Sequence, residues 1–460
     1  MAELWSPRAR IRAERDLWLA VLRAQIDLGL GLPEGVDADA VLADFEAVVD
    51  EIDLDAIAAR EAVTRHDVKA RIDDFTARAG HELIHLGMTS RDLTESIEQF
   101  QIRRSLELVR DDLIAVLARL ARRARQYRDR VIVARTHNVP AQATTLGKRF
   151  ADAAEETLWH TERIEALCAE LPLRGIKGPV GTRLDQLDLL GSVEAVDELE
   201  RRVAEHLGFT RILDATGQVY PRSLDLAVVS TLVAATGGVS SLAVTLRLMA
   251  GHEAVSEGFG EGQVGSSAMP HKMNARSLER IGALRTVLDG HLTMAAGLAG
   301  RQWNEGDVSC SVVRRVLLPG VFCAVDGLLH TAMAVLDELE VFEPVLDAEV
   351  SRDLPFVATT RFLTAAVAAG MGRETAHEII KRHAVAAALE RREGGAGDLV
   401  GRLADDADFA LGREALEAIL ADREAFVGTA PLQVDRVVAR VDALTARHPG
   451  AARAAPEMRV

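Results

Sequence analysis

The sequence predicts an all-α protein built around a bundle of long helices. Through most of the chain, apolar residues recur every three or four positions, as they do along one face of a helix. The alternating runs typical of strands are almost absent, and Val131-Ile132-Val133 is the one short β-branched candidate. At about 100–200 residues per domain, the 460 residues allow roughly two to four domains.

The clearest helical stripe consists of Leu93, Ile97, Phe100, Leu106, Val109, Leu113, Val116 and Leu120. The same periodicity predicts further long helices over 141–171, 193–207, 224–257, 277–298 and 312–339. Such helices cannot bury their apolar faces singly, so they should pack together. We therefore expect a helical domain over residues 1–90, a central long-helix bundle over 91–341 and a C-terminal helical domain over 342–460.

Glycine-rich loops interrupt the helical pattern. Residues 175–181 contain three glycines and a proline, and residues 258–270 contain four glycines, so neither stretch can be helical. We expect the second loop to extend over 258–274.

The charge balance excludes several classes of partner. Lys and Arg number 54 against 70 Asp and Glu, which gives a net charge of −16. Nucleic acids and anionic membranes both require a cationic face, so we expect neither as a partner. Three cysteines in no metal-binding spacing suit a reducing compartment. The first 18 residues have no apolar core behind their charges, and we expect a cytoplasmic protein without a signal peptide.

One stretch is long enough to cross a membrane. Leu226 to Leu246 contains 21 residues without a charge, but eight of them are Ser, Thr or Gly, and Gly237-Gly238 lies near its middle. This composition favours a helix buried on all sides inside a large bundle.

Two motifs suggest chemistry that their surroundings do not support. His81-Glu82-Leu83-Ile84-His85 matches the zinc-protease pattern H-E-x-x-H, but no third ligand follows at the required spacing, so we expect no metal. Gly260-Glu-Gly262-Gln-Val-Gly265 matches the dinucleotide fingerprint, which has meaning only after a strand of a parallel sheet. The residues before it have a helical period instead.

The same glycine-rich loop continues into residues that could act on a substrate. Ser266, Lys272 and Asn274 offer a hydroxyl, an ammonium and an amide directly after a glycine hinge, and a predicted helix with Glu279 follows. A loop of this kind could close over a bound substrate and bring these groups down together.

The string from Ser266 to Glu279 resembles the signature G-S-S-x-M-P-x-K-x-N of the fumarase/aspartase superfamily. His271, directly before the lysine, is similar to the adenylosuccinate lyase branch of that superfamily. Other stretches that resemble family motifs are 64–68, 85–90, 135–138, 217–222 and 303–307, the last running on to Arg314-Arg315.

This resemblance implies an elimination. The expected reaction is the anti β-elimination of fumarate from adenylosuccinate, giving AMP, and from the succinyl-aminoimidazole-carboxamide ribotide in purine biosynthesis. Ser266 would be the general base and His137 the general acid, because one group must remove a C–H proton and another must protonate the departing nitrogen. Lys272 and Asn274 would hold a carboxylate as charge builds on it, and Glu279 would orient and charge His137.

The resemblance also assigns residues to substrate binding. Thr89 and Ser90 would bind a succinyl carboxylate, with Gln218 near the leaving nitrogen. The nucleotide pocket and the ribose phosphate would involve Arg65, His66, Asp67, Thr136, Arg280, Ser311 and Arg315. His85 would support the site. The resemblance further implies a homotetramer whose active sites each draw on three subunits, and no cofactor.

The sequence departs from adenylosuccinate lyases at two phosphate contacts. An Arg-Tyr pair usually stands about ten residues before the tryptophan that matches Trp5, whereas this sequence starts four residues before Trp5. Gly306 stands where many members have arginine. Two alternatives therefore stay open: a paralogous lyase that acts on another N-substituted succinate, and a non-catalytic protein on the same fold. The sequence does not define the preference between the two purine substrates or the regulation.

Overall fold

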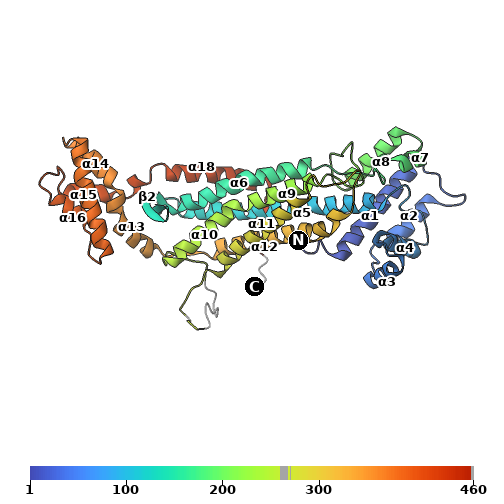
Figure 1. The fold of residues 1–460 in the computed structure, drawn as a ribbon, viewed down its shortest axis with the longest axis horizontal. Helices are drawn as coiled ribbons and strands as arrows, with labels where there is room; N and C mark the ends of the chain where they lie inside the picture. The colour runs from blue at the N-terminus through green and yellow to red at the C-terminus, as the bar shows by residue number, and fades with distance from the viewer. Residues whose placement is uncertain (259–267, 270, 457–460) are drawn as a thin grey trace. The chain divides into compact units, whose positions relative to one another are not determined.

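The computed structural model is drawn in Figure 1 and describes residues 1–258, 268–269 and 271–456. About 68% of the chain is helical. Within the described residues there are only two sheets, and each has two strands. The prediction of an all-α fold is therefore confirmed.

The chain forms two compact units, each assembled from separate stretches of sequence. The first comprises Met1–Leu113, Trp159–Gly237 and Ala283–His330, and the second comprises Ile114–Leu158, Gly238–Gly282 and Thr331–Val460. The division predicted over 1–90, 91–341 and 342–460 stays a prediction.

The first unit contains the N-terminal helices and one portion of each of four long helices. Its complete helices are α1 (Pro7–Asp27), α2 (Ala38–Ala47), α3 (Leu54–Thr64), α4 (Asp67–Ala79), α7 (Leu184–Leu190), α8 (Val193–His206) and α9 (Ser223–Ala235). The long helices are α5 (Ser90–Gln126), α6 (Leu146–Glu170), α11 (Arg276–Leu298) and α12 (Ser309–Glu338). Helix α8 packs against α1, and α3 packs against α4.

The predicted helical stripe of α5 forms the core of this unit. Leu93, Ile97, Leu106, Val109 and Leu113 are completely buried. Because successive members lie three, four or nine positions apart, they share one face of the helix. The helices predicted over 193–207, 277–298 and 312–339 are confirmed by α8, α11 and α12, which begin and end within three residues of those bounds.

The second unit contains a β-hairpin that the sequence reading only half predicted. Strand β1 (Val131–Thr136) pairs antiparallel with β2 (Val139–Thr145), so the helix predicted from residue 141 was wrong over its first five residues. Helix α6 begins at Leu146 because the Thr145 hydroxyl accepts a hydrogen bond from the Lys148 N–H at 3.1 Å, which caps the helix.

The charge-free stretch from Leu226 to Leu246 belongs to two helices. The single helix predicted over 224–257 was wrong: α9 ends at Ala235, α10 (Gly237–Gly251) follows, and Val255–Ser256 form strand β3 paired with β4 (Glu340–Val341). A Cβ on Gly238 would lie 2.8 Å from the Ala153 carbonyl oxygen of α6. Glycine at this position therefore allows α10 and α6 to approach closely.

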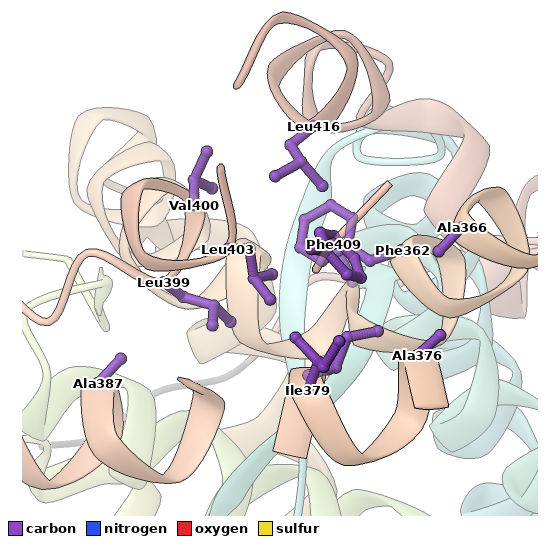
Figure 2. Close-up of a cluster of buried hydrophobic side chains, with 12 residues drawn as sticks. Phe362, Ala366, Ala376, Ile379, Ala387, Leu399, Val400, Leu403, Phe409 and Leu416 are labelled. Atoms are coloured by element: carbon purple, nitrogen blue, oxygen red, sulfur yellow. The ribbon is translucent and has the colours of Figure 1, made fainter. Parts of the chain in front are cut away.

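Shorter helices make up the rest of the second unit. They are α13 (Glu343–Val357), α14 (Thr359–Ala368), α15 (Arg373–Arg392), α16 (Leu399–Ala404), α17 (Arg413–Ala421) and α18 (Ala430–Arg447), with 3-10 turns at Glu424–Phe426 and Ala451–Arg453. Figure 2 shows side chains of α14 to α17 meeting around Phe362 and Phe409, which gives these helices a common apolar core.

Two segments have the length and hydropathy of membrane spans, Ser223–Gly251 and Ser309–Glu338. Within the structure, 56% and 61% of their most apolar windows are buried. Core helices of large bundles have the same property.

Candidate active site

The turn between α3 and α4 carries the first group of predicted site residues. Arg65 ends α3 in the left-handed conformation, with φ of 53°. His66 then caps α4, because its Nδ1 accepts a hydrogen bond from the Lys69 N–H at 3.2 Å. Arg65 and His66 are exposed and Asp67 is half-buried, so all three side chains can reach a ligand.

The Asp67 carboxylate forms an ion pair with Arg71, which also contacts a buried glutamate. Arg71 Nη2 lies 3.0 Å from Asp67 Oδ2, and Arg71 Nε lies 3.0 Å from the fully buried Glu14. Burial raises the pKa of Asp67, but Arg71, the Val68 N–H and Arg10 outweigh it, and the pKa lies below its usual value. Arg315, 4.0 Å away, thus faces an ionised carboxylate.

Thr89 and Ser90 stand at the start of the longest helix. The Thr89 N–H donates to Asp92 Oδ2 at 2.7 Å, and the Asp92 N–H donates back to the Thr89 carbonyl at 3.0 Å. The first of these bonds is one half of a capping box, in which the acidic side chain three positions on binds the N-cap N–H. Together the two bonds fix the backbone that carries the Thr89 and Ser90 hydroxyls at the start of α5.

Asp92 also forms a buried ion pair with Arg174, and neither residue belongs to the predicted site. Its Oδ1 accepts hydrogen bonds from Arg174 Nη1 at 2.5 Å, the Lys177 N–H at 2.9 Å and the Gly178 N–H at 3.0 Å. Arg174 in turn donates to the carbonyls of Gly175, Gly178 and Gly217. Both charged side chains are completely buried. One pair therefore connects the Thr89 turn, the 175–181 loop and the segment before Gln218.

Gln218 is positioned by a second loop. Its N–H donates to the Glu305 carbonyl at 2.6 Å, and a Cβ on Gly217 would lie 2.0 Å from that same oxygen. Gly306 follows with φ of +134°, a backbone conformation that side chains other than glycine rarely adopt. The backbone at position 306 is therefore one that favours glycine.

This conformation makes a prediction about Gly306. Changing Gly306 to alanine or arginine should destabilise the protein by about 1–3 kcal/mol, because a Cβ disfavours this φ. Urea unfolding would measure the loss. Gly412, whose φ is −78° and whose Cβ position is open, provides the matched control, Gly412→Ala. Equal stabilities of the two alanine variants would contradict the requirement for glycine.

Arg314 and Arg315 are adjacent in the sequence but have different roles. Arg314 is 2% exposed and binds Glu98 at 2.5 Å and Asp225 at 2.8 Å, whereas Arg315 is 62% exposed. Arg222 binds Glu95 at 2.7 Å within the same buried cluster. Arg222 and Arg314 therefore hold α5, α9 and α12 together, and Arg315 is the one available to a phosphate.

In the second unit, His137 stands at the tip of the β1–β2 hairpin. His137 and Asn138 form its two-residue turn, with φ of 53° and 60°. Two successive left-handed residues define a type I′ turn, which non-glycine side chains adopt at some cost. The imidazole is exposed at the tip, and Thr136 beside it is exposed as well. Strain of this kind is typical of functional positions.

Four of the remaining predicted residues lie just before α11 or in its first turns, whereas Ser311 is half-buried in the first turn of α12. Lys272, Glu279 and Arg280 are exposed, and Asn274 and Glu279 line a cleft of about 420 Å³ together with Arg247 and Leu248. Arg247 Nη2 lies 3.4 Å from Glu279 Oε1. Ser266 lies outside the described residues.

The structure brings the predicted residues together only in groups. In the first unit Asp67 meets Arg315, and Asp92 and Arg174 connect Thr89 to the Gln218 segment. In the second unit, no hydrogen bond or ion pair between described residues joins His137 to Glu279. The pairing of these two residues stays a prediction, and Arg247 is the partner of Glu279 within the chain.

The two misleading motifs have structural explanations. The H-E-x-x-H string is not helical, because α4 ends at Ala79; His81 binds Asp44 at 2.7 Å and His85 binds Trp18. The two imidazoles therefore do not share a helix face. The string from Gly260 to Gly265 lies outside the described residues, and the antiparallel two-residue strand β3 precedes it.

The chain is similar to known proteins over most of its length. A family model described as Lyase matches residues 6–288, and one described as Adenylosuccinate lyase C-terminus matches residues 355–437. The chain is 35% identical to adenylosuccinate lyase of Saccharomyces cerevisiae over 443 residues, covering 95% of this chain and 91% of that one. It is 30% identical to adenylosuccinate lyase of Pyrococcus horikoshii over 397 residues, covering 85% and 86%.

Solved structures share the fold. The 3-carboxy-cis,cis-muconate lactonizing enzyme from Pseudomonas putida superposes with a TM-score of 0.83 at 23% identity, covering 97% of both chains. Fumarate lyase from Mesorhizobium sp. BNC1 has a TM-score of 0.80 at 22% identity, covering 95% of this chain and 97% of that one.

The helical fold and the matched motifs define a lyase of the fumarase/aspartase superfamily. Within that superfamily, the chain belongs to the adenylosuccinate lyase family and is a C–N lyase. The resemblance seen in the motifs is thereby confirmed.

Proposed function

We propose that this enzyme eliminates fumarate from adenylosuccinate, giving AMP, and from the succinyl-aminoimidazole-carboxamide ribotide. The observation that carries the proposal is the 35% identity to a named adenylosuccinate lyase over 95% of the chain, combined with the presence of Ser266, Lys272, His137 and Glu279. A non-catalytic member of the fold would have no reason to keep all four.

The proposed reaction breaks one C–N bond. Ser266 removes a proton from the succinyl carbon next to a carboxylate, the electron pair of that C–H bond forms the C=C bond of fumarate, and the nitrogen leaves with the C–N electrons. His137 gives that nitrogen its proton. Lys272 and Asn274 hold the carboxylate on which charge builds, and an ammonium there stabilises the transition state more than the substrate.

The proposed binding roles follow the motif resemblance. Thr89 and Ser90, whose backbone Asp92 fixes at the start of α5, bind the other succinyl carboxylate. Gln218 contacts the substrate near the leaving nitrogen. Arg65, His66 and Asp67 bind the nucleotide, and Ser311, Arg315 and Arg280 take the phosphate, because guanidinium groups match phosphate oxygens.

The substrate class can be tested by comparing kcat/KM values for three compounds. Adenylosuccinate and the succinyl-aminoimidazole-carboxamide ribotide should both be cleaved, and an N-succinyl compound without ribose phosphate should be cleaved far more slowly. Faster cleavage of the phosphate-free compound would favour the alternative, a paralogue that acts on another N-substituted succinate.

We also propose that the enzyme is a cytoplasmic homotetramer whose active sites are shared between subunits. Apolar side chains on the long helices are unusually exposed for residues of a bundle. Val312 and Val316 of α12 are 72% and 56% exposed. Gly290 and Gly297 of α11 have open space over their Cα atoms. Such faces favour contact with further copies of the chain.

Shared sites predict that two inactive variants rescue each other. Mixing His137→Asn with Ser266→Ala subunits, followed by dissociation and reassembly, should restore about a quarter of the wild-type activity, because each site needs one intact residue from each of two subunits. Each variant reassembled alone serves as the control. Failure of the mixture to exceed both controls would contradict sharing of His137 and Ser266 between subunits.

A further inference from the structure

The segment from His85 to Thr89 is fixed by hydrogen bonds from several helices. Gln25 of α1 and Gln186 of α7 both donate to the Leu86 carbonyl at 3.0 Å, and Gln186 also donates to the Gly87 carbonyl at 2.8 Å. A Cβ on Gly87 would lie 2.7 Å from the Gln186 Nε2 atom. His85 itself has φ of 65°, in the left-handed region. Such a conformation persists only where the surroundings enforce it.

The strongest constraint on His85 comes from Trp18. The Trp18 indole Nε1–H donates to His85 Nδ1 at 2.9 Å, with the two rings at 82° to each other. Trp18 is 1% exposed, so its indole has no water to bond instead. An indole nitrogen can only donate, and a neutral imidazole has one donor and one acceptor nitrogen. With Nδ1 as the acceptor, the ring proton is on Nε2.

We propose that Trp18 is a positioning residue that fixes His85 as the neutral Nε2–H tautomer, so that His85 donates a hydrogen bond to the substrate and does not transfer a proton. The inference rests on the proposed function for the identity of the substrate. It separates the roles of two histidines in the site: His137 supplies the proton, and His85 binds an oxygen of the substrate.

The groups around His85 agree with a neutral ring. Its titratable neighbours are Asp92 of α5 and His66 at the start of α4, and the Trp18 indole of α1 donates to its Nδ1. Burial lowers the pKa of His85 to about 4; Asp92 opposes this shift and His66 adds to it. A protonated ring would also turn an Nδ1–H toward the Trp18 N–H, with two donors facing each other.

The tautomer can be observed directly by NMR of the full-length enzyme labelled with ¹⁵N at histidine. We expect a signal typical of an unprotonated nitrogen at Nδ1 and of N–H at Nε2, without titration of His85 near neutral pH. In Trp18→Phe, which keeps an aromatic ring but lacks the donor, His85 should lose its preference for the Nε2–H tautomer. Trp5→Phe removes another indole donor of the same unit, the one to Ser105, and should leave His85 as it was.

Kinetics of His85 variants provide a second test that does not depend on Trp18→Phe folding. His85→Gln keeps a neutral N–H donor near the Nε2 position and should lose about threefold to tenfold in kcat/KM, mainly through KM, as expected for a weakened hydrogen bond. His85→Leu, of similar size but without a donor, should lose more than His85→Gln.

Three results would overturn the inference. They are an Nδ1–H signal in the wild type, a His85 tautomer that Trp18→Phe leaves unchanged, and a fall in kcat of about 10²–10⁴ in His85→Gln, which is the loss expected for a proton-transfer group. Failure of the proposed function would look different, because an enzyme that does not cleave adenylosuccinate would still show the tautomer by NMR.

Discussion

Replacing His137 by asparagine should lower kcat for adenylosuccinate by a factor of about 10²–10⁴, the usual contribution of a general acid or base. His137 occupies the first turn position of the β1–β2 hairpin with φ of 53°. Asparagine tolerates this left-handed conformation better than most residues, so the turn should persist while the proton donor is lost. Steady-state kinetics together with thermal unfolding would separate loss of chemistry from loss of folding.

The neighbouring residue provides the control for this variant. Asn138 has φ of 60° in the same turn, and Asn138→Gly keeps that conformation without touching the imidazole. We expect this variant to retain most of the activity. If His137→Asn kept a kcat within tenfold of the wild type, His137 could not be the general acid, and another proton donor would have to be sought.

The second large effect is expected at Asp92. Asp92→Asn should lower the free energy of unfolding by about 3–5 kcal/mol, because it leaves the buried Arg174 guanidinium without its counter-charge. An asparagine would also turn an NH₂ group toward N–H donors, since both carboxylate oxygens of Asp92 accept hydrogen bonds. Urea unfolding followed by circular dichroism would measure the loss. KM should rise as well, because Thr89 and the segment before Gln218 are fixed through this pair.

An exposed ion pair on α8 provides the control for Asp92→Asn. Arg201 binds Glu198 at 2.6 Å on α8, and both side chains are partly exposed. Ion pairs in solvent contribute little, so Arg201→Gln should leave the unfolding midpoint nearly where it is. An Asp92→Asn enzyme as stable as Arg201→Gln would show that the buried pair is not what holds the three loops together.

Much of the fold could be predicted from the sequence because long amphipathic helices have a clear period. The α5 stripe and the bounds of α8, α11 and α12 depend only on where apolar residues recur. The hairpin was half missed because β2, from Val139 to Thr145, runs directly into α6, and its few apolar positions continue the helical pattern. The break between α9 and α10 lies beside Gly237-Gly238, and it was missed because a buried helix can also contain glycine.

The candidate site, like the fold, could be predicted from the sequence only in part. The exposed candidate residues could be proposed from motifs, since chemistry restricts their type and spacing. The buried residues that position them could not be predicted, because Arg174 lies 82 positions from Asp92, and Trp18 lies 67 positions from His85. Asp92 alone had a local signal, as the acidic residue three positions after Thr89 in a capping box. Arg314 and Arg315, adjacent in sequence, could be told apart only by their burial.

The central claim is that this chain cleaves adenylosuccinate at the site that contains Ser266. The most direct test is to incubate the purified enzyme with adenylosuccinate and to quantify both products over time, with a Ser266→Ala enzyme prepared in the same way. We predict that AMP and fumarate appear in equal amounts and that the variant releases neither. Equal activity of the two preparations, or fumarate without AMP, would contradict the account.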